Sequence, residues 1–283
     1  MAAQVLASGR SQVLGVVAFN STLFGPASTL FGIEEAAREA GYFVSVDSLR
    51  TLDTSSVIAA VERLRGQSVD GVVIMAPTST ATRALHELPD DIPIMAVQGG
   101  GDGVVPSVII DQAAGAARAT RHLLELGHET VVHVSGPPAW IEAGQRADAW
   151  RQVLREADRE VTPVLEGDWS ARAGYDLGKD LVGRRDVTAI FAANDHIALG
   201  LYRAASEAGL RVPDDLSIVG FDDVPEAAYF APPLTTVHQD FAAVGSLSLA
   251  GLVEQIEGHP WEAASITVDP DLVVRGSTGP PPG

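Results

Sequence analysis

The sequence predicts an α/β protein made of two doubly wound parallel-sheet lobes joined by multiple crossovers. Short β-branched runs alternate with amphipathic stretches of helical length, which is typical of a parallel sheet covered by helices on both faces. This alternation starts again near residue 112, so two units of similar size are expected. With 283 residues, of which 46% are hydrophobic, the chain is long enough for each unit to bury its own core.

The first lobe is expected to consist of residues 12–111 and 241–268. Buried strands are predicted at 13–18, 43–47, 71–75, 93–97 and 107–110. Helices are predicted at 26–40, 54–66 and 79–87, with a further helix at 241–257 after the chain returns.

The second lobe is expected to consist of residues 112–239 and 269–278. Helices are predicted at 112–126, 141–158, 171–184 and 195–208, and strands at 130–135, 163–166, 188–193 and 216–221. Terminal strands are expected within 265–275. Crossovers near 111, 240 and 270 would form a hinge. Residues 1–11 read as a linker and residues 279–283 as a disordered tail.

Composition and charge exclude several classes of protein. The chain has 37 acidic and 19 basic residues, a formal net charge of −18, so these residues alone should not hold DNA at physiological salt. No apolar stretch reaches the roughly 18 residues of a membrane span, and the N-terminus lacks the pattern of a secretory signal. There is no cysteine, which suits a cytoplasmic protein and excludes thiolate metal sites.

Enzyme signatures are missing. The sequence has no phosphate-binding loop, no dinucleotide fingerprint after its first strand and no nucleophile elbow. His128, Glu129 and His133 do not have the spacing of a zinc protease. Asp222 and Asp223 are adjacent, so they cannot stand on opposite sides of a glycosidic bond. We therefore expect no enzyme activity, no cofactor and no metal.

Side chains suited to a sugar follow several predicted strands, where parallel sheets bind their ligands. Asn194 and Asp222 each end a strand, and Asp195 is expected to cap the next helix. Trp169 follows a short strand and could offer an aromatic wall. Each also has a plainer interpretation: Asn194 could serve only its turn, Trp169 could lie in the core, and one of Asp222 and Asp223 could stabilise the next turn.

Four ordered sequence blocks resemble the effector-binding core of LacI/GalR-family transcriptional repressors, which have a type I periplasmic-binding-protein-like fold. They are Gly167–Ala171, Ala193–Asp195 with Ala198–Gly200, Phe221–Asp223, and Pro232–Gln239. The resemblance extends from Leu6 to Ser277. It implies a small sugar, galactoside-like as a first expectation, bound in a cleft between the lobes.

The resemblance also assigns individual residues, some of which have plainer alternatives. It places Arg146, Asn194 and Asp222 at sugar hydroxyls, although Arg146 alone could be a solvated helix residue. It places Trp169 and Phe241 at apolar walls, although Phe241 alone would be read as core. The remaining implied ligand and crossover residues are Gln239, Leu23, Phe24, Pro26, Gln98, Asp111 and Asp240.

Three positions depart from the family member that the chain most resembles. Gln98 stands where that protein has an acidic residue, Phe24 where it has a histidine, and Ile110 where it has a phenylalanine. Because these changes alter both polarity and volume, the identity of the sugar stays open.

The implied function is a homodimeric repressor that releases operator DNA when the sugar binds. The DNA would be held through a domain missing from this chain, with Leu6 as a minor-groove wedge in a hinge helix. An ordinary flexible N-terminus is the alternative for residues 3–11. An extracytoplasmic sugar-binding protein of a transport system is the alternative for the whole chain, because it shares the fold.

Overall fold

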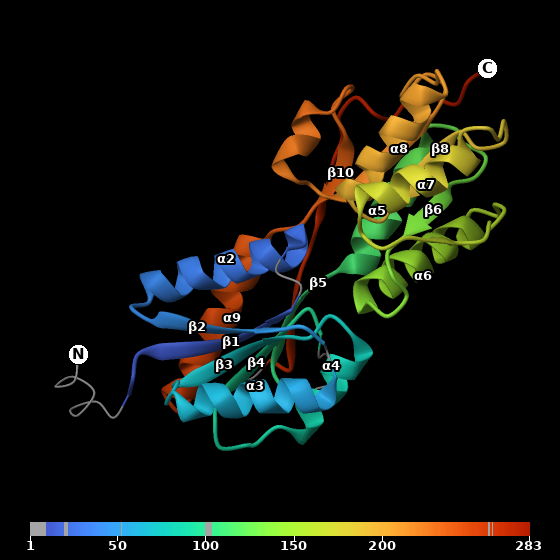
Figure 1. The fold of residues 1–283 in the computed structure, drawn as a ribbon. Coiled ribbons are helices and arrows are strands. Elements are labelled where there is room, and N and C mark those ends of the chain that lie inside the picture. Colours follow the sequence, from blue (N-terminus) through green and yellow to red (C-terminus); the bar gives the residue numbers. More distant parts are fainter. Residues whose placement is uncertain (1–9, 20–21, 52, 100–103, 260, 262) are drawn as a thin grey trace. The chain divides into compact units, whose positions relative to one another are not determined.

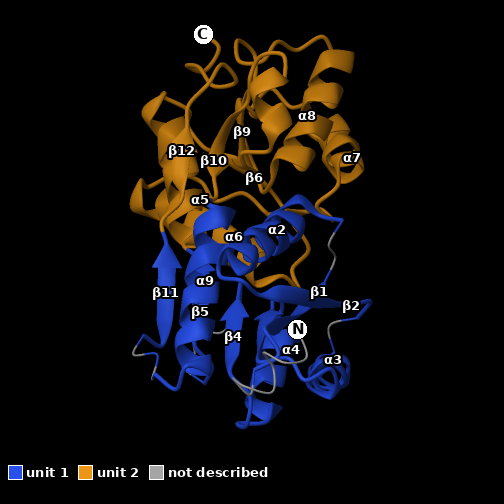
Figure 2. Ribbon diagram, turned by 90° about the vertical axis from the view of Figure 1, so that its left-hand side faces the viewer, with its two compact units in different colours: residues 1–110, 240–268 blue, residues 111–239, 269–283 orange. Residues whose placement is uncertain are grey.

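The computed structural model describes residues 10–19, 22–51, 53–99, 104–259, 261 and 263–283 (Figure 1). The chain forms two compact units, coloured blue and orange in Figure 2. Unit 1 comprises residues 1–110 and 240–268, and unit 2 comprises residues 111–239 and 269–283. The chain therefore passes from one unit to the other three times. Each unit is an α/β structure around a largely parallel sheet, so the predicted fold class is confirmed.

Unit 1 has a six-stranded sheet in the order β11-β5-β4-β3-β1-β2, and all of its strand pairs are parallel. Its strands are β1 (Val13–Phe19), β2 (Phe43–Leu49), β3 (Gly71–Met75), β4 (Ile94–Val97), β5 (Ser107–Ile110) and β11 (Ser265–Val268). Its helices are α2 (Phe24–Glu39), α3 (Thr54–Gly66), α4 (Ser79–Ala84), the 3-10 turn η1 (Leu85–Glu87) and α9 (Phe241–Ile256).

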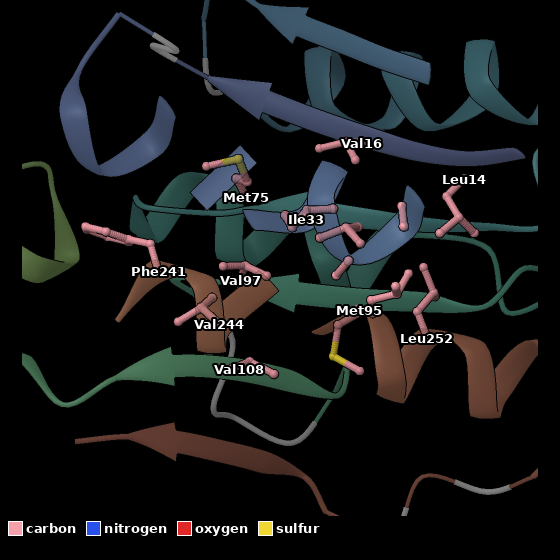
Figure 3. Close-up of a cluster of buried hydrophobic side chains, with 14 of the residues drawn as sticks. Leu14, Val16, Ile33, Met75, Met95, Val97, Val108, Phe241, Val244 and Leu252 are labelled. Carbon is pink, nitrogen blue, oxygen red and sulfur yellow. The ribbon is translucent and has the colours of Figure 1, made fainter. Parts of the chain in front are cut away.

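The unit 1 sheet buries both faces because strand side chains alternate in direction. Val16 and its neighbours at even spacing pack against α2 and α9, whereas Val17 packs against α3 and α4. Figure 3 shows the first of these clusters, with Phe241 at the end to which the strand arrows point. That end is where a doubly wound sheet binds ligands.

Unit 2 repeats this plan with the sheet order β12-β10-β9-β8-β6-β7, in which only the β10–β12 pair is antiparallel. Its strands are β6 (Val132–Ser135), β7 (Leu165–Glu166), β8 (Ala189–Ala192), β9 (Ser217–Asp222), β10 (Thr235–His238) and β12 (Asp271–Val273). Its helices are α5 (Gln112–Glu125), α6 (Ile141–Glu156), α7 (Ala171–Leu181), α8 (Asp195–Glu207) and the 3-10 turn η2 (Pro225–Tyr229).

Two of the three crossovers end in the same local structure. Asp111 and Asp240 each accept a hydrogen bond of 2.8 Å from the backbone N–H three residues later, and so cap α5 and α9. Their backbone angles are nearly equal, with φ/ψ of −73°/84° and −80°/79°. The two aspartates predicted at crossovers therefore fix where a helix begins after the chain enters each unit.

The structure differs from several sequence predictions. Strand 43–47 was expected to be buried, but β2 is an edge strand and Phe43 is 61% exposed. Residues 235–238, expected only as an extended crossover, pair with both β9 and β12.

Both ends of the described chain are bonded to the folded units. The tail was expected to be disordered from Gly279, yet this residue donates to Ser217 Oγ and accepts from His128. The predicted hinge segment, including Leu6, lies mainly outside the described residues. Arg10 and Ser11, which are described, bond to Ile256 and Asp70 of unit 1. Within the described part of the chain, no helix is long and apolar enough to cross a membrane.

Candidate functional site

Four buried polar side chains of unit 2 form a chain of hydrogen bonds at the carboxyl ends of its strands. Arg146 Nε donates to Gln112 Oε1 at 2.8 Å, and Gln112 Nε2 donates to Gln239 Oε1 at 2.8 Å. Gln239 Nε2 donates to Asp222 Oδ1 at 2.7 Å. Arg146 Nη2 then lies 4.0 Å from the same carboxylate oxygen, which closes the ring. We call these four residues the polar ring.

The elements of the fold bring the ring together from distant parts of the sequence. Asp222 ends β9 and Gln239 follows β10, its neighbour in the sheet. Gln112 is the first residue of α5, and Arg146 lies on the buried face of α6. All four side chains are at least nine-tenths buried. Such burial is rare for an arginine or an aspartate unless the charge has partners.

The guanidinium of Arg146 has two further partners. Its Nη1 donates to the backbone oxygen of Ala193, and its Cζ lies 3.7 Å from the ring centroid of Phe221. Stacking on an aromatic face is favourable for a planar cation. The alternative in which Arg146 is a solvated helix residue is therefore wrong.

Asn194 takes the structural role that was its plainer interpretation. Its Oδ1 accepts from Ile197 N at 2.8 Å and caps α8, and its Nδ2 donates to the Trp169 backbone oxygen at 3.2 Å. The prediction that Asp195 is the cap is wrong. Asp195 is fully buried and accepts from Val224 N and Thr236 Oγ1, so it ties α8 to β10 and to the segment after β9.

Trp169 lies beside the polar ring, and the centroid of its indole ring is 5.5 Å from Arg146 Cζ. Its indole packs edge to face with Trp140, at 5.7 Å between centroids, and is 7% exposed. The indole lies directly over Gly136, where an added Cβ would be 2.3 Å from the ring. Only glycine permits this approach, so Gly136 fixes the position of the tryptophan.

Trp169, Asp222 and Gln98 have unusual backbone conformations, with φ of 72°, 107° and 66°. Non-glycine residues rarely adopt such angles, and each costs of order 1–3 kcal/mol. Strain of this kind gathers at functional sites. These three are predicted ligand residues, whereas Gln12, Ser68, Asp158 and Asp223 also have positive φ and are not.

Burial changes the acidity of the carboxyl groups near Arg146. It raises the pKa of Asp222 to about 6, against the opposing effects of Arg146 and the Gln239 hydrogen bond. It raises the pKa of Glu142 to about 7 and holds the pKa of Asp195 well above its usual range. Burial also lowers the pKa of Arg146, although the three carboxylates oppose that change.

The predicted ligand residues of unit 1 gather at the start of two helices. Phe24 begins α2 and Phe241 begins α9, and their rings meet edge to face at 5.9 Å. Leu23 precedes α2, and Pro26 is buried in its first turn. Phe241 is 7% exposed and belongs to the core cluster of unit 1, so it has the core role given as its alternative. Together these residues make an apolar surface.

Gln98 follows β4 in unit 1, and its Oε1 is buried with no hydrogen-bond partner among the described residues, which leave out 100–103. Ile110, which replaces a phenylalanine of the family, ends β5 and packs into the core cluster of Phe241. Two of the three departures from the family pattern thus leave one buried polar atom without a partner among the described residues and one apolar side chain smaller.

Two residues of the unit 2 site, Gln112 and Glu142, were not predicted from the sequence. Gln112 links Arg146 to Gln239, and its position just after the crossover Asp111 was the available signal. Glu142 lies one helical turn before Arg146, which was a second signal. Asp223 has a different role from Asp222, because it accepts from Arg275 Nη2 at 2.7 Å. Among the described residues, no group of histidines and carboxylates could hold a metal ion.

Comparison with known proteins places the chain in a family. The periplasmic binding protein-like domain family matches residues 120–278. The chain is 31% identical to the lactose operon repressor of Escherichia coli, over 91% of this chain and 72% of that protein. The chain belongs to the LacI family of transcriptional repressors.

Two further comparisons support membership of the LacI family. The HTH-type transcriptional repressor PurR of Mannheimia succiniciproducens is 31% identical over 97% of this chain and 84% of that protein. A crystal structure of the lac repressor dimer bound to operator and the anti-inducer ONPF matches with a TM-score of 0.89, at 30% identity over 98% of each chain. The chain is thus a ligand-responsive repressor core of the LacI family, not an enzyme. The relatives favour this over the transport alternative.

Proposed function

We propose that this repressor core binds a small sugar through the polar ring of unit 2 and weakens operator binding in response. The ring carries the proposal, because it holds a cation, a carboxylate and two amides, buried and pre-oriented, next to an indole. Sugars offer rows of hydroxyls and an apolar face, which such a set matches. A galactoside-like sugar is the first candidate, since one relative is a lactose operon repressor.

A thermal-shift screen of mono- and disaccharides tests the binding. A sugar that raises the unfolding temperature of the wild type should have a much smaller effect on Asp222→Ala and on Trp169→Ala. A shift that stays undiminished in both variants would place the sugar elsewhere.

The contribution of unit 1 to sugar binding stays a prediction. Leu23, Phe24, Pro26 and Gln98 are proposed to contact the same ligand, with Phe241 packed behind Phe24. Phe24→Ala should then lower the affinity of the protein for the sugar found in the screen. The matched control is Phe31→Ala, because Phe31 is also on α2 but 63% exposed.

Coupling to DNA can be tested in a chimera. The DNA-binding segment of the Escherichia coli lactose operon repressor would precede this chain, and operator occupancy would be followed by gel shift. Allosteric coupling typically changes affinity by roughly 5- to 150-fold, so the sugar should lower operator affinity by a factor in that range. Unchanged occupancy at saturating sugar would refute the proposed response. Because a repressor acts on DNA, we place the protein in the cytoplasm.

A homodimer is the proposed state of the protein. The matching lac repressor structure is a dimer. In unit 2, Leu199 on α8 is 46% exposed and Tyr229 on η2 is 86% exposed. The two elements are neighbours, since the ring of Tyr202 on α8 lies 5.4 Å from that of Phe230, the residue that follows η2. Exposed apolar residues on neighbouring elements are typical of a surface that a second copy covers.

A further inference from the structure

Glu142 is a buried carboxylate that the hydrogen bonding of the structure leaves unused. It is 6% exposed, and neither of its carboxylate oxygens has a hydrogen-bond partner in the described part of the chain. A buried carboxylate without partners is strongly unfavourable, and native proteins seldom keep one without a functional reason.

The position of Glu142 connects it to the polar ring. It lies four residues before Arg146 on α6, so both residues share one face of that helix. It interacts electrostatically with Arg146 and with Asp222. The Nε1 of Trp169, whose ring also lies close to Arg146, is likewise buried without a partner. Unsatisfied groups thus gather around Arg146.

Carboxyl groups outnumber basic groups near Arg146, and the raised pKa values of all three carboxyl groups show that one guanidinium does not offset the cost of burying them. Three buried carboxyl groups, Glu142, Asp195 and Asp222, act on this single guanidinium. His133 adds no charge, because burial lowers its pKa to about 3. Asp195 has hydrogen bonds from Thr236 and Val224, and Asp222 has one from Gln239, whereas Glu142 has none from another described residue. The missing partner of Glu142 is therefore both a hydrogen-bond donor and a positive charge.

We propose that Glu142 binds a protonated amine of the ligand, so that the effector is an amino sugar. This inference rests on the proposed function, in which the polar ring holds the sugar hydroxyls. An ammonium group has three donors and no acceptor, so it can satisfy both oxygens of Glu142 and balance its charge. A neutral hydroxyl can satisfy an oxygen but leaves the charge imbalance in place.

Calorimetry with matched sugars tests the inference. D-galactose is compared with D-galactosamine and N-acetyl-D-galactosamine, and D-glucose with its two corresponding derivatives, at pH 7. In at least one series the free amine should bind roughly tenfold or more tightly than both uncharged forms. Glu142→Gln should weaken amine binding by about 10- to 100-fold and change binding of the parent sugar little. Asp223→Asn, whose carboxylate faces Arg275 instead, should keep the preference.

A pH series on the unmodified protein gives a second readout that needs no variant. Protonation of Glu142 removes the charge that attracts the amine. The ratio of amine affinity to parent-sugar affinity should therefore fall roughly tenfold or more between pH 7 and pH 5. Asp222 and Asp195 also have raised pKa values and face the same guanidinium, and the Gln variant separates their effects from that of Glu142. Equal binding of amine and parent sugars, or a preference that survives in Glu142→Gln, would overturn the inference and leave the proposed function intact. Binding of no sugar of either kind would overturn both.

Discussion

Arg146 and Asp222 are both buried, yet Nη2 and Oδ1 of the pair lie 4.0 Å apart, with the connection made through Gln112 and Gln239. A direct ion pair would have shorter, bidentate contacts. The separation leaves hydrogen-bonding capacity on both charged groups. A ligand hydroxyl can use that capacity as acceptor from the guanidinium and as donor to the carboxylate.

The first prediction concerns Asp222. Asp222→Asn keeps the shape of the side chain but removes its charge, so the sugar loses a charge-assisted hydrogen bond worth roughly 1.5–3 kcal/mol. Affinity should fall about 10- to 100-fold, measured by calorimetry. Asp223→Asn is the matched control, because Asp223 pairs with Arg275 and His238 instead. Equal losses in the two variants would contradict the assignment of Asp222.

The second prediction concerns Gln112. Gln112→Leu leaves Arg146 Nε and Gln239 Oε1 buried without their partner. Each such loss costs about 1–3 kcal/mol, so urea unfolding should report a destabilisation of about 2–6 kcal/mol. The exposed Gln152, which bonds to Glu156, supplies the control Gln152→Leu, with an effect of about 0.5 kcal/mol or less. A comparably small effect of Gln112→Leu would show that the ring adds little to stability.

The third prediction concerns the glycine beneath Trp169. Gly136→Ala would place a Cβ 2.3 Å from the indole, which must then move. The near-ultraviolet circular dichroism of the free protein should change, and sugar affinity should fall. Gly144→Ala, on α6, is the control because its Cβ would meet nothing within 4 Å. An unchanged spectrum for Gly136→Ala would mean that the indole is not held by this contact.

The fourth prediction concerns the dimer. Leu199→Asp combined with Tyr229→Asp should give a monomer in light scattering, because burying two carboxylates in an apolar interface is costly. The control is Val274→Asp, which introduces a charge at a position that is 58% exposed. This variant should keep the mass of a dimer in light scattering. A dimer that survives the double change would place the interface elsewhere.

The spacing of hydrophobic residues along the sequence predicted most of the helices and strands, because it reflects which positions are buried. The continuous apolar run of β3 is buried on both faces, as such a run requires. Periodicity did not show that Phe43 is on an edge strand, since strand order depends on contacts far apart in the sequence. It also gave no strand at 235–238, where the two prolines just before it suggested only extended chain.

The site was harder to predict than the fold because polar residues carry no periodic signal. Asp222 could be found because it ends β9, and Asn194 because it lies between β8 and α8. Which of Asn194 and Asp195 caps α8 depends on tertiary contacts, because Asp195 bonds to Thr236 on β10. Gln112 and Glu142 gain their importance only when α5 packs against both α6 and β9. No local pattern reveals that.

The last prediction concerns the stability of the free protein and follows from Glu142. Its pKa is raised from 4.5 to about 7 in the folded chain, so the folded state binds the proton more tightly than the unfolded state does. A group with a raised folded pKa adds stability that is complete below about pH 4.5 and is lost as pH rises through about 7. A rise of this size corresponds to about 3 kcal/mol.

The comparison of wild type with Glu142→Gln isolates this effect, because the amide does not titrate. The variant should gain stability over the wild type as pH increases from 5 to 8, and the gain should level off above pH 8 at about 3 kcal/mol. Urea unfolding at a series of pH values measures it. Other carboxyl groups with raised pKa values, such as Asp222, titrate in both proteins. Their effect therefore largely cancels in the difference between the two free energies of unfolding. A gap that stays constant with pH would show that Glu142 has the same pKa in the folded and unfolded chain, and burial would then not raise the pKa of this carboxyl group.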